Sequence, residues 1–210
     1  MSKAPLVIRI PTMTAATSIQ TQFGKYFDFT QVTEYEYDLN EAVHAVCNIC
    51  RFNGHTSRFY SVGEHTLLGE AALNLKGTDP RIIRSWLLHD LHEAYVGDIP
   101  LPLKRTSLAS GLVELEERVQ AAFLEQCAMP MDAVLVKGAS VEYNDVLMLC
   151  YEVIHLMDDD SDAEEWSSVP RGYFEEARKL PNYWATLYPH GSPRLIEEAL
   201  LRLFRKYDLL

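Results

Sequence analysis

Residues 82–93 read IIRSWLLHDLHE, and this stretch decides the expected fold. It lies in a segment that opens with Asp79 and Pro80, an N-cap followed by a first-turn proline, and ends at Gly97. These signals predict a helix over 80–96 that is apolar on most sides and therefore central in the fold. The helix nevertheless carries four ionisable groups in five residues, His89 to Glu93. Buried charges of this kind need partners or a metal.

Helical patterns recur on both sides of this segment. Asp38 and Ser61 are each followed three residues later by Glu, which is the pattern of a helix-opening capping box. No stretch shows the sustained alternation of a strand, and residues 1–37 look irregular or extended. The other expected helices cover about 38–52, 61–75, 107–128, 130–157, 172–179 and 194–207.

These elements predict an all-α fold, a single-domain helical bundle with a metal site in its core. The core is expected at about 38–158, with an irregular N-terminal segment 1–37 and a helical C-terminal extension 160–210. A length of 210 residues favours one domain over two.

The net charge of −11 restricts the partners. Duplex binding is mostly phosphate neutralisation by Lys and Arg, so a nucleic-acid binder is disfavoured, as is docking on an anionic membrane. A small anionic substrate is still compatible, because one metal and a few Arg can reverse the charge locally. Six of the acidic residues fall in 158–165, outside the expected site.

No apolar run approaches the length of a membrane-spanning helix, and residues 1–11 lack the long apolar region of a signal peptide. Four cysteines are too few for a disulfide scaffold, and the lone pair Cys47 and Cys50 sits in an apolar helical pattern that favours core packing. A reducing cytoplasm fits this usage.

Two further polar residues lie where apolar ones belong. His65 falls among Val62, Leu68 and Ala72 at helical spacing, and Asp145 lies on a largely apolar stripe of its helix. Alone, each could be a hydrogen-bonded core residue. Together with the residues at 89 and 90 they place two His and two Asp on three helices, a donor set that suits zinc, manganese, iron, cobalt or nickel.

The pattern His65…His89-Asp90…Asp145 resembles the signature of the HD-domain metal-dependent phosphohydrolases. The surrounding segments RFNGHT (51–56), FYSVGEH (59–65) and GDIP (97–100) strengthen the likeness. Residues 38–158 resemble the small group that contains bacterial 5′-deoxynucleotidases and phage dATP triphosphohydrolases. The flanking segment TQFG (21–24) is similar to the phage-type members.

The resemblance implies a divalent metal held by His65, His89, Asp90 and Asp145, with Mg²⁺ as a candidate second ion accompanying the nucleotide. It also implies catalytic roles for Glu93 and Asp98 near the attacking water, a phosphate contact for Arg51, a homo-oligomer, and a cytoplasmic location (the host cytoplasm if the chain is phage-encoded). Asp98 has an alternative reading as a turn residue before Ile99 and Pro100.

Four more residues are candidates for substrate binding. Lys104 and Arg105 follow the proline loop and could add positive charge at the mouth of the site, or could simply be solvated. His55 and Arg58 lie in the loop before the helix that carries His65, and such loops often carry function.

The sequence departs from the family pattern at two positions. Gly63 stands where Ala is usual before the Glu-His pair, and we expect it only to loosen the helix start. His92 stands where a small residue is common, and it could be an outer neighbour of the site or a packing residue.

The expected activity is metal-dependent hydrolysis of nucleotide phosphate esters. The phage-type flanks favour dNTP, in particular dATP, cleaved to deoxynucleoside and triphosphate. A 5′-deoxynucleotidase acting on dNMP and a non-catalytic nucleotide-binding module are the alternatives. A zinc peptidase is disfavoured, because His89 and His92 are three rather than four residues apart. The acidic run 158–162 lacks the Gly and Glu of a calcium loop and reads as a solvated loop.

Overall fold

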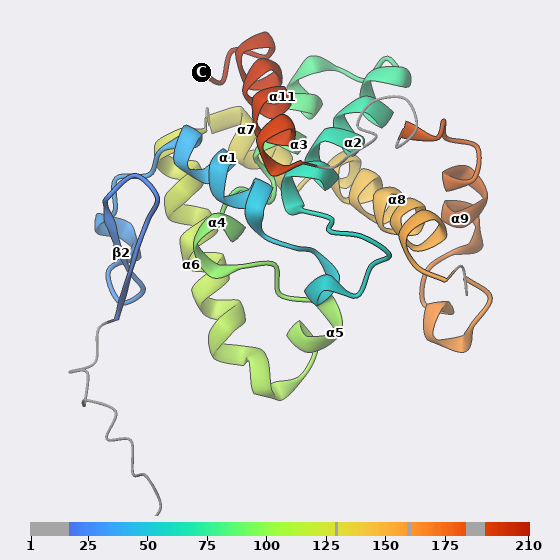
Figure 1. Cartoon of the computed structure of the whole chain (residues 1–210), viewed down its shortest axis with the longest axis horizontal. Coiled ribbons are helices and arrows are strands. Elements are labelled where there is room, and N and C mark those ends of the chain that lie inside the picture. Colours follow the sequence, from blue (N-terminus) through green and yellow to red (C-terminus); the bar gives the residue numbers. More distant parts are fainter. Residues whose placement is uncertain (1–16, 129, 159–160, 184–191) are drawn as a thin grey trace, which may run out of the picture.

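Helices form most of the chain in the computed structural model, which describes residues 17–128, 130–158, 161–183 and 192–210 (Figure 1). The predominantly helical architecture predicted from the sequence is confirmed for this part of the chain. The helices are α1 Leu39–Asn48, α2 Val62–Leu75, α3 Pro80–Leu88, α4 Glu93–Val96, α5 Leu101–Lys104, α6 Ser110–Cys127, α7 Pro130–Val136, α8 Ala139–Leu156, α9 Arg171–Ala177 and α11 Pro193–Lys206, with 3₁₀ turns at Val32–Glu34, Phe52–Gly54, Ser107–Ala109 and Glu164–Trp166.

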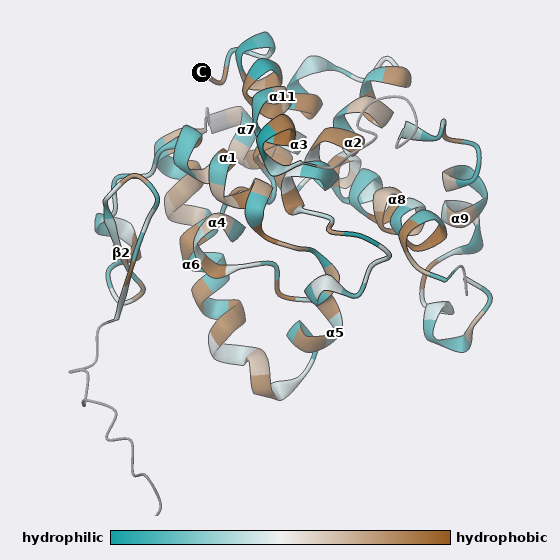
Figure 2. Ribbon diagram, in the orientation of Figure 1, coloured by the Kyte–Doolittle hydropathy of each residue, from teal (hydrophilic) through white to brown (hydrophobic). Residues whose placement is uncertain are grey.

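Helices α2 and α3 lie at the centre of the described structure. Their neighbours cover them on several sides: α11 packs on α1 and α2, α7 packs on α3, and α8 packs on α2 and α9 (Figure 1). Trp86 of α3 and Leu68 of α2 are completely buried in the connecting core. Figure 2 shows hydrophobic and hydrophilic residues alternating around the helices, the pattern of elements that each bury one face.

Three predicted helix starts are confirmed by their caps, whereas the helix expected from residue 107 begins at Ser110 without a side-chain cap. The side chain of Asp38 accepts hydrogen bonds from the backbone N–H groups of Asn40 and Glu41, and that of Ser61 accepts from Glu64. Asp79 caps α3, with Pro80 as its first residue. Each cap satisfies N–H groups that have no partner within their own helix.

The helix predicted over 80–96 is wrong in its middle, because α3 ends at Leu88 and α4 begins only at Glu93. Between them the backbone N–H groups bond three residues back, as in His89 to Trp86 and Leu91 to Leu88. This tighter winding turns the polar cluster out of the regular helical path.

Two other predicted helices are also shorter or divided. The helix expected to reach Phe52 ends at Asn48, since Cys50 instead pairs with Ser61 in an isolated bridge. The helix expected over 130–157 is split into α7 and α8 at Gly138.

The N-terminal segment contains a short antiparallel hairpin, which the sequence pattern did not predict. Strand β1 Ser18–Gln20 pairs with β2 Tyr26–Asp28 in the register Ser18↔Asp28, and Phe27 is fully buried. Residues 1–16 of the segment expected to be irregular lie outside the described residues, as do 159–160 of the acidic run. None of the helices described here is long and apolar enough to cross a membrane.

Candidate metal centre

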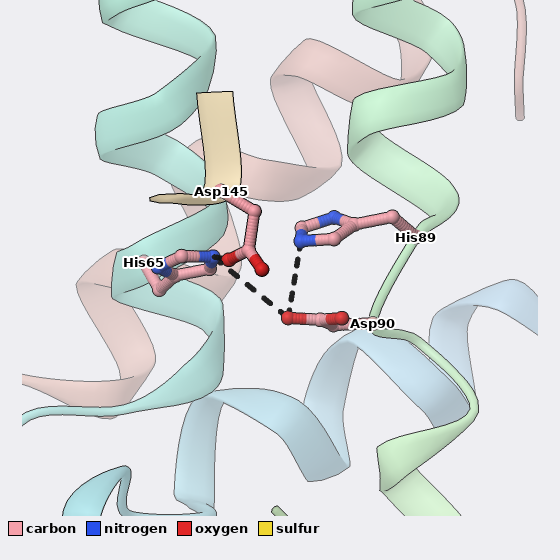
Figure 3. A group of neighbouring side chains, drawn as sticks. All are labelled: His65, His89, Asp90 and Asp145. Atoms are coloured by element: carbon pink, nitrogen blue, oxygen red, sulfur yellow. Dashed lines mark ion pairs between the residues drawn. The ribbon is translucent and has the colours of Figure 1, made fainter. Parts of the chain in front are cut away.

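Three helical segments bring the four predicted ligands together. His65 comes from α2, His89 and Asp90 follow the end of α3, and Asp145 comes from α8 (Figure 3). One ligand atom of each residue lies within 4.8 Å of those of the others. The segments are far apart in the sequence, so it is the packing of α2, α3 and α8 that creates the cluster.

The imidazole nitrogens that face the cluster lack hydrogen bonds. His65 Nε2 lies 3.2 Å from Asp145 Oδ1, and His89 Nε2 lies 3.1 Å from Asp90 Oδ2. Both Nε2 atoms are buried without a hydrogen-bond partner among the described residues. Buried polar atoms are normally paired, so two orphaned nitrogens beside two carboxylates fit a divalent transition metal.

The break after α3 sets the orientation of His89. Its Nδ1 lies 2.5 Å from the carbonyl oxygen of Trp86, which can only accept, so Nδ1–H donates. The indole ring of Trp86 stacks on the imidazole with ring centroids 4.0 Å apart, and its own N–H donates to the carbonyl of Thr66. His89 Nε2 is therefore held toward the cluster.

His65 is oriented by a carboxylate that the sequence reasoning did not select. Glu152 is completely buried, and its Oε1 lies 2.5 Å from His65 Nδ1 and 2.6 Å from the hydroxyl of Tyr60. The spacing in the sequence could have pointed to it, because Glu152 follows Asp145 by two helical turns and shares its face.

The close approach of these groups shifts the pKa values of the clustered side chains. Burial opposes the charge of Asp90, but His89, His65 and Arg51 hold the pKa of this carboxyl well below its usual range. Burial and Arg51 work against a charged His65, yet Glu152 and Asp145 raise the pKa of its imidazole to about 9. The cluster thus attracts positive charge.

Asp145 is more open to solvent than its apolar stripe predicted. Its side chain is 48 % exposed, whereas that of His65 is fully buried. The expectation of four ligands on buried faces is therefore wrong for Asp145, because α8 lies at the edge of the cluster. The cluster is therefore open to solvent on the side of Asp145.

The two predicted catalytic acids lie beside the cluster. Glu93 is buried and its Oε2 has no hydrogen-bond partner among the described residues. Burial, together with the charges of Asp90 and Asp98, raises the pKa of Glu93 well above its usual range. Burial also raises the pKa of Asp98, with Arg51 opposing the shift. Both carboxyls therefore favour the protonated form more than exposed ones would.

A second group of polar residues adjoins Glu93. His92 Nε2 lies 3.5 Å from Glu116 Oε1, and the ammonium of Lys104 lies 2.5 Å from the same oxygen. His92 thus pairs with Glu116, and it is not one of the four clustered ligands. A cavity of about 230 Å³ opens here, lined by Asp90, His92, Glu93, Lys104, Glu116, Glu117 and Gln120.

The predicted substrate contacts divide into two sets. Arg51 lies at the cluster, with its Nη1 3.5 Å from Asp90 Oδ2. Lys104 lies in the adjoining cavity. Arg58 instead forms a two-pronged ion pair with Glu64 at 2.6 and 2.9 Å, while His55 and Arg105 are exposed. For these last two, the structure describes no side-chain contact with the cluster.

Two uncharacterized proteins resemble more than half of this chain. The chain is 34 % identical over 134 residues to the uncharacterized protein YfdR of Escherichia coli (strain K12), covering 64 % of this chain and 69 % of that protein. It belongs to the YfdR family. An uncharacterized protein of Rhodobacter capsulatus is 32 % identical over 113 residues, which are 51 % of this chain and 56 % of that relative. No protein-family model matches the chain.

Proposed function

We propose that this member of the YfdR family is a metal-dependent phosphohydrolase of the HD-domain type that acts on nucleotides. The observation that supports the proposal is the meeting of His65, His89, Asp90 and Asp145, with both imidazole Nε2 atoms buried and without a hydrogen-bond partner among the described residues. Unpaired imidazole nitrogens beside carboxylates are a donor set for Mn²⁺, Fe²⁺, Co²⁺, Ni²⁺ or Zn²⁺. A bound divalent ion supplies Lewis-acid polarisation of a phosphoryl oxygen and a water of lowered pKa.

The surrounding side chains have complementary roles. Arg51 presents a guanidinium beside Asp90, where it can take a phosphate oxygen in a charge-assisted hydrogen bond. Lys104 adds a second positive charge in the adjoining cavity. These two groups face the phosphates, so a chain with a net charge of −11 can bind an anion locally.

Glu93 is placed to handle protons. It is buried at the edge of the ligand cluster with one oxygen unpaired, and its raised pKa allows it to hold a proton for a leaving oxygen or to accept one from water. Asp98 shares this environment through its neighbours Arg51 and Asp90.

The substrate we propose is a deoxynucleoside triphosphate, with dATP preferred and inorganic triphosphate as product. The likeness of the 21–24 segment to phage-type members supports this choice. A deoxynucleoside monophosphate is the alternative substrate of the same site, with orthophosphate as product.

One assay tests these proposals. Purified protein is incubated with the four dNTPs and four dNMPs in the presence of Co²⁺, Mn²⁺, Zn²⁺ or Mg²⁺, and the products are identified. We expect triphosphate from dATP, and no turnover by His89→Ala or Asp90→Ala, which should also lose the metal. Orthophosphate from dNMP would move the substrate to the alternative. Full activity of either variant after chelation would refute the site.

A further inference from the structure

Glu152 contacts both a predicted metal ligand and the predicted phosphate-binding arginine. We propose that it is a positioning residue that couples the two, an inference that rests on the proposed function. Its carboxylate is completely buried in α8, where a charge is costly unless it is paired. Its two oxygens contact different partners, so the consequences of each contact can be followed separately.

The first oxygen fixes the ring of His65. Oε1 lies 2.5 Å from His65 Nδ1 and accepts a second hydrogen bond from the hydroxyl of Tyr60 at 2.6 Å. An ionised carboxylate only accepts, so His65 carries a proton on Nδ1 and directs Nε2 toward Asp145. Glu152 thereby selects the nitrogen that is available to a metal.

The second oxygen lies beside Arg51. Glu152 Oε2 is 3.6 Å from Arg51 Nε, and both atoms are buried without a hydrogen-bond partner among the described residues. On its other side the guanidinium is 3.5 Å from Asp90 Oδ2. Arg51 is therefore shared between one carboxylate that is a metal ligand and one that is not.

This sharing has an electrostatic consequence for the metal site. The charge of Glu152 offsets much of the attraction between Arg51 and Asp90. Without that charge, Asp98 and Asp90 are the main carboxylates left to attract the guanidinium. Asp90 is the one of these two within ion-pair distance, so the guanidinium then competes with a cation for it. The loss of Glu152 should weaken metal binding through both His65 and Arg51.

The test measures metal affinity without nucleotide, by competition of the full-length protein with a chelator for Co²⁺. We expect Glu152→Gln to raise the metal Kd by about 10–100-fold, the range typical of residues that support a ligand. Adding Arg51→Met should recover part of the loss, because the competing guanidinium is gone. The matched control is Glu70→Gln, which alters a buried carboxylate that accepts from Tyr207 away from the cluster and should leave the Kd unchanged.

The outcomes separate this inference from the proposed function. A folded Glu152→Gln variant with wild-type Kd overturns the positioning role alone, whereas wild-type protein that binds no metal overturns both. Further weakening by Arg51→Met overturns the coupling. If Glu152→Gln does not fold, the ring ¹⁵N chemical shifts of His65 in the zinc-loaded wild type test the proposal instead, because they report which nitrogen carries the proton. A protonated Nδ1 on His65 supports the role, and a metal-bound Nδ1 refutes it.

Discussion

Each imidazole of the cluster is held by the nitrogen that faces away from it. His65 is held by the carboxylate of Glu152, and His89 by the carbonyl oxygen of Trp86. Both contacts leave Nε2 for the cluster, but the first partner is a carboxylate and the second is a backbone carbonyl. The two ligands should therefore differ in basicity, with His65 the stronger donor.

Glu93 gives the first prediction. Glu93→Gln keeps the size of the side chain but removes its ability to transfer a proton, so we expect turnover to fall by about 10²–10⁴-fold. Occupancy of the four-ligand cluster should be unchanged, because Glu93 belongs to a second candidate group, with His92 and Glu116. Single-turnover rates and metal analysis on the same sample measure both. Wild-type turnover would remove Glu93 from the mechanism.

Arg58 gives a prediction with a pH dependence. Its guanidinium compensates the buried carboxylate of Glu64, and its own side chain is 34 % exposed. We expect Arg58→Met to lower the free energy of unfolding by about 1–3 kcal/mol at pH 7. The loss should be smaller than on breaking a fully buried pair, because solvent screens part of the interaction. Arg105→Met, which alters an exposed residue, should be nearly neutral.

The sign of the pH effect follows from Glu64. Burial already raises the pKa of its carboxyl, and the loss of Arg58 raises it further. A group whose pKa is raised in the folded state stabilises the fold when it is protonated. The loss of unfolding free energy in Arg58→Met, relative to the wild type, should therefore shrink as the pH falls through the pKa of Glu64. Urea unfolding at pH 7 and pH 5 measures it. A deficit that grows on acidification would contradict this assignment.

At the scale of elements, close helix contacts set the positions of the ligands. Gly69 in α2 lies so near α3 that an added Cβ would stand 1.9 Å from Cζ2 of Trp86, the ring that stacks on His89. Gly63 similarly approaches α1, where a Cβ would stand 2.7 Å from Cys47 Sγ. Gly63, which we expected only to loosen the start of the helix, is thus required by the close packing of α2 on α1. Cys47 itself is fully buried, as the core-packing interpretation predicted.

Gly69→Ala tests this contact. Overpacking against Trp86 should lower the free energy of unfolding by about 1–3 kcal/mol and weaken metal binding as the ring beneath His89 shifts. Gly111→Ala is the matched control, because an added Cβ in α6 meets nothing within 4 Å. There the higher helix propensity of Ala should stabilise the protein by up to about 1 kcal/mol. Equal effects at both positions would show that the α2–α3 approach is not tight.

Across the whole molecule, the acidic residues fall into an exposed group and an interior group. Asp162, Glu164 and Glu165 are exposed, whereas Asp90 and Glu152 lie inside with Arg51 between them. The interior acids are concentrated where the predicted ligands meet. A divalent cation there offsets repulsion between buried carboxylates, which solvent screens less than repulsion between surface acids. A bound metal should therefore stabilise the folded protein.

Metal removal tests this coupling. A ligand that binds only the folded state adds about 2.7 kcal/mol at 100 times its Kd, which for a protein of this size corresponds to a rise in Tm of roughly 5–10 °C. We expect EDTA to lower the Tm of metal-loaded protein by that amount and to leave His89→Ala unchanged. Calorimetry with and without Co²⁺ measures the shift. Equal wild-type Tm values in both conditions would contradict a metal in the cluster.

Local sequence alone was enough to predict three helix starts and the chemical character of the centre. Caps such as Asp38 and Ser61 are local, and a His or Asp on an apolar stripe is visible from periodicity alone. The break after Leu88, the exposure of Asp145 and the contacts of Glu152 become visible in the folded chain alone. The reason is that these depend on contacts between α2, α3 and α8, which residues distant in the sequence make only after packing. The sequence pattern indicates which polar groups need partners, and the packing of the helices determines which partners they contact.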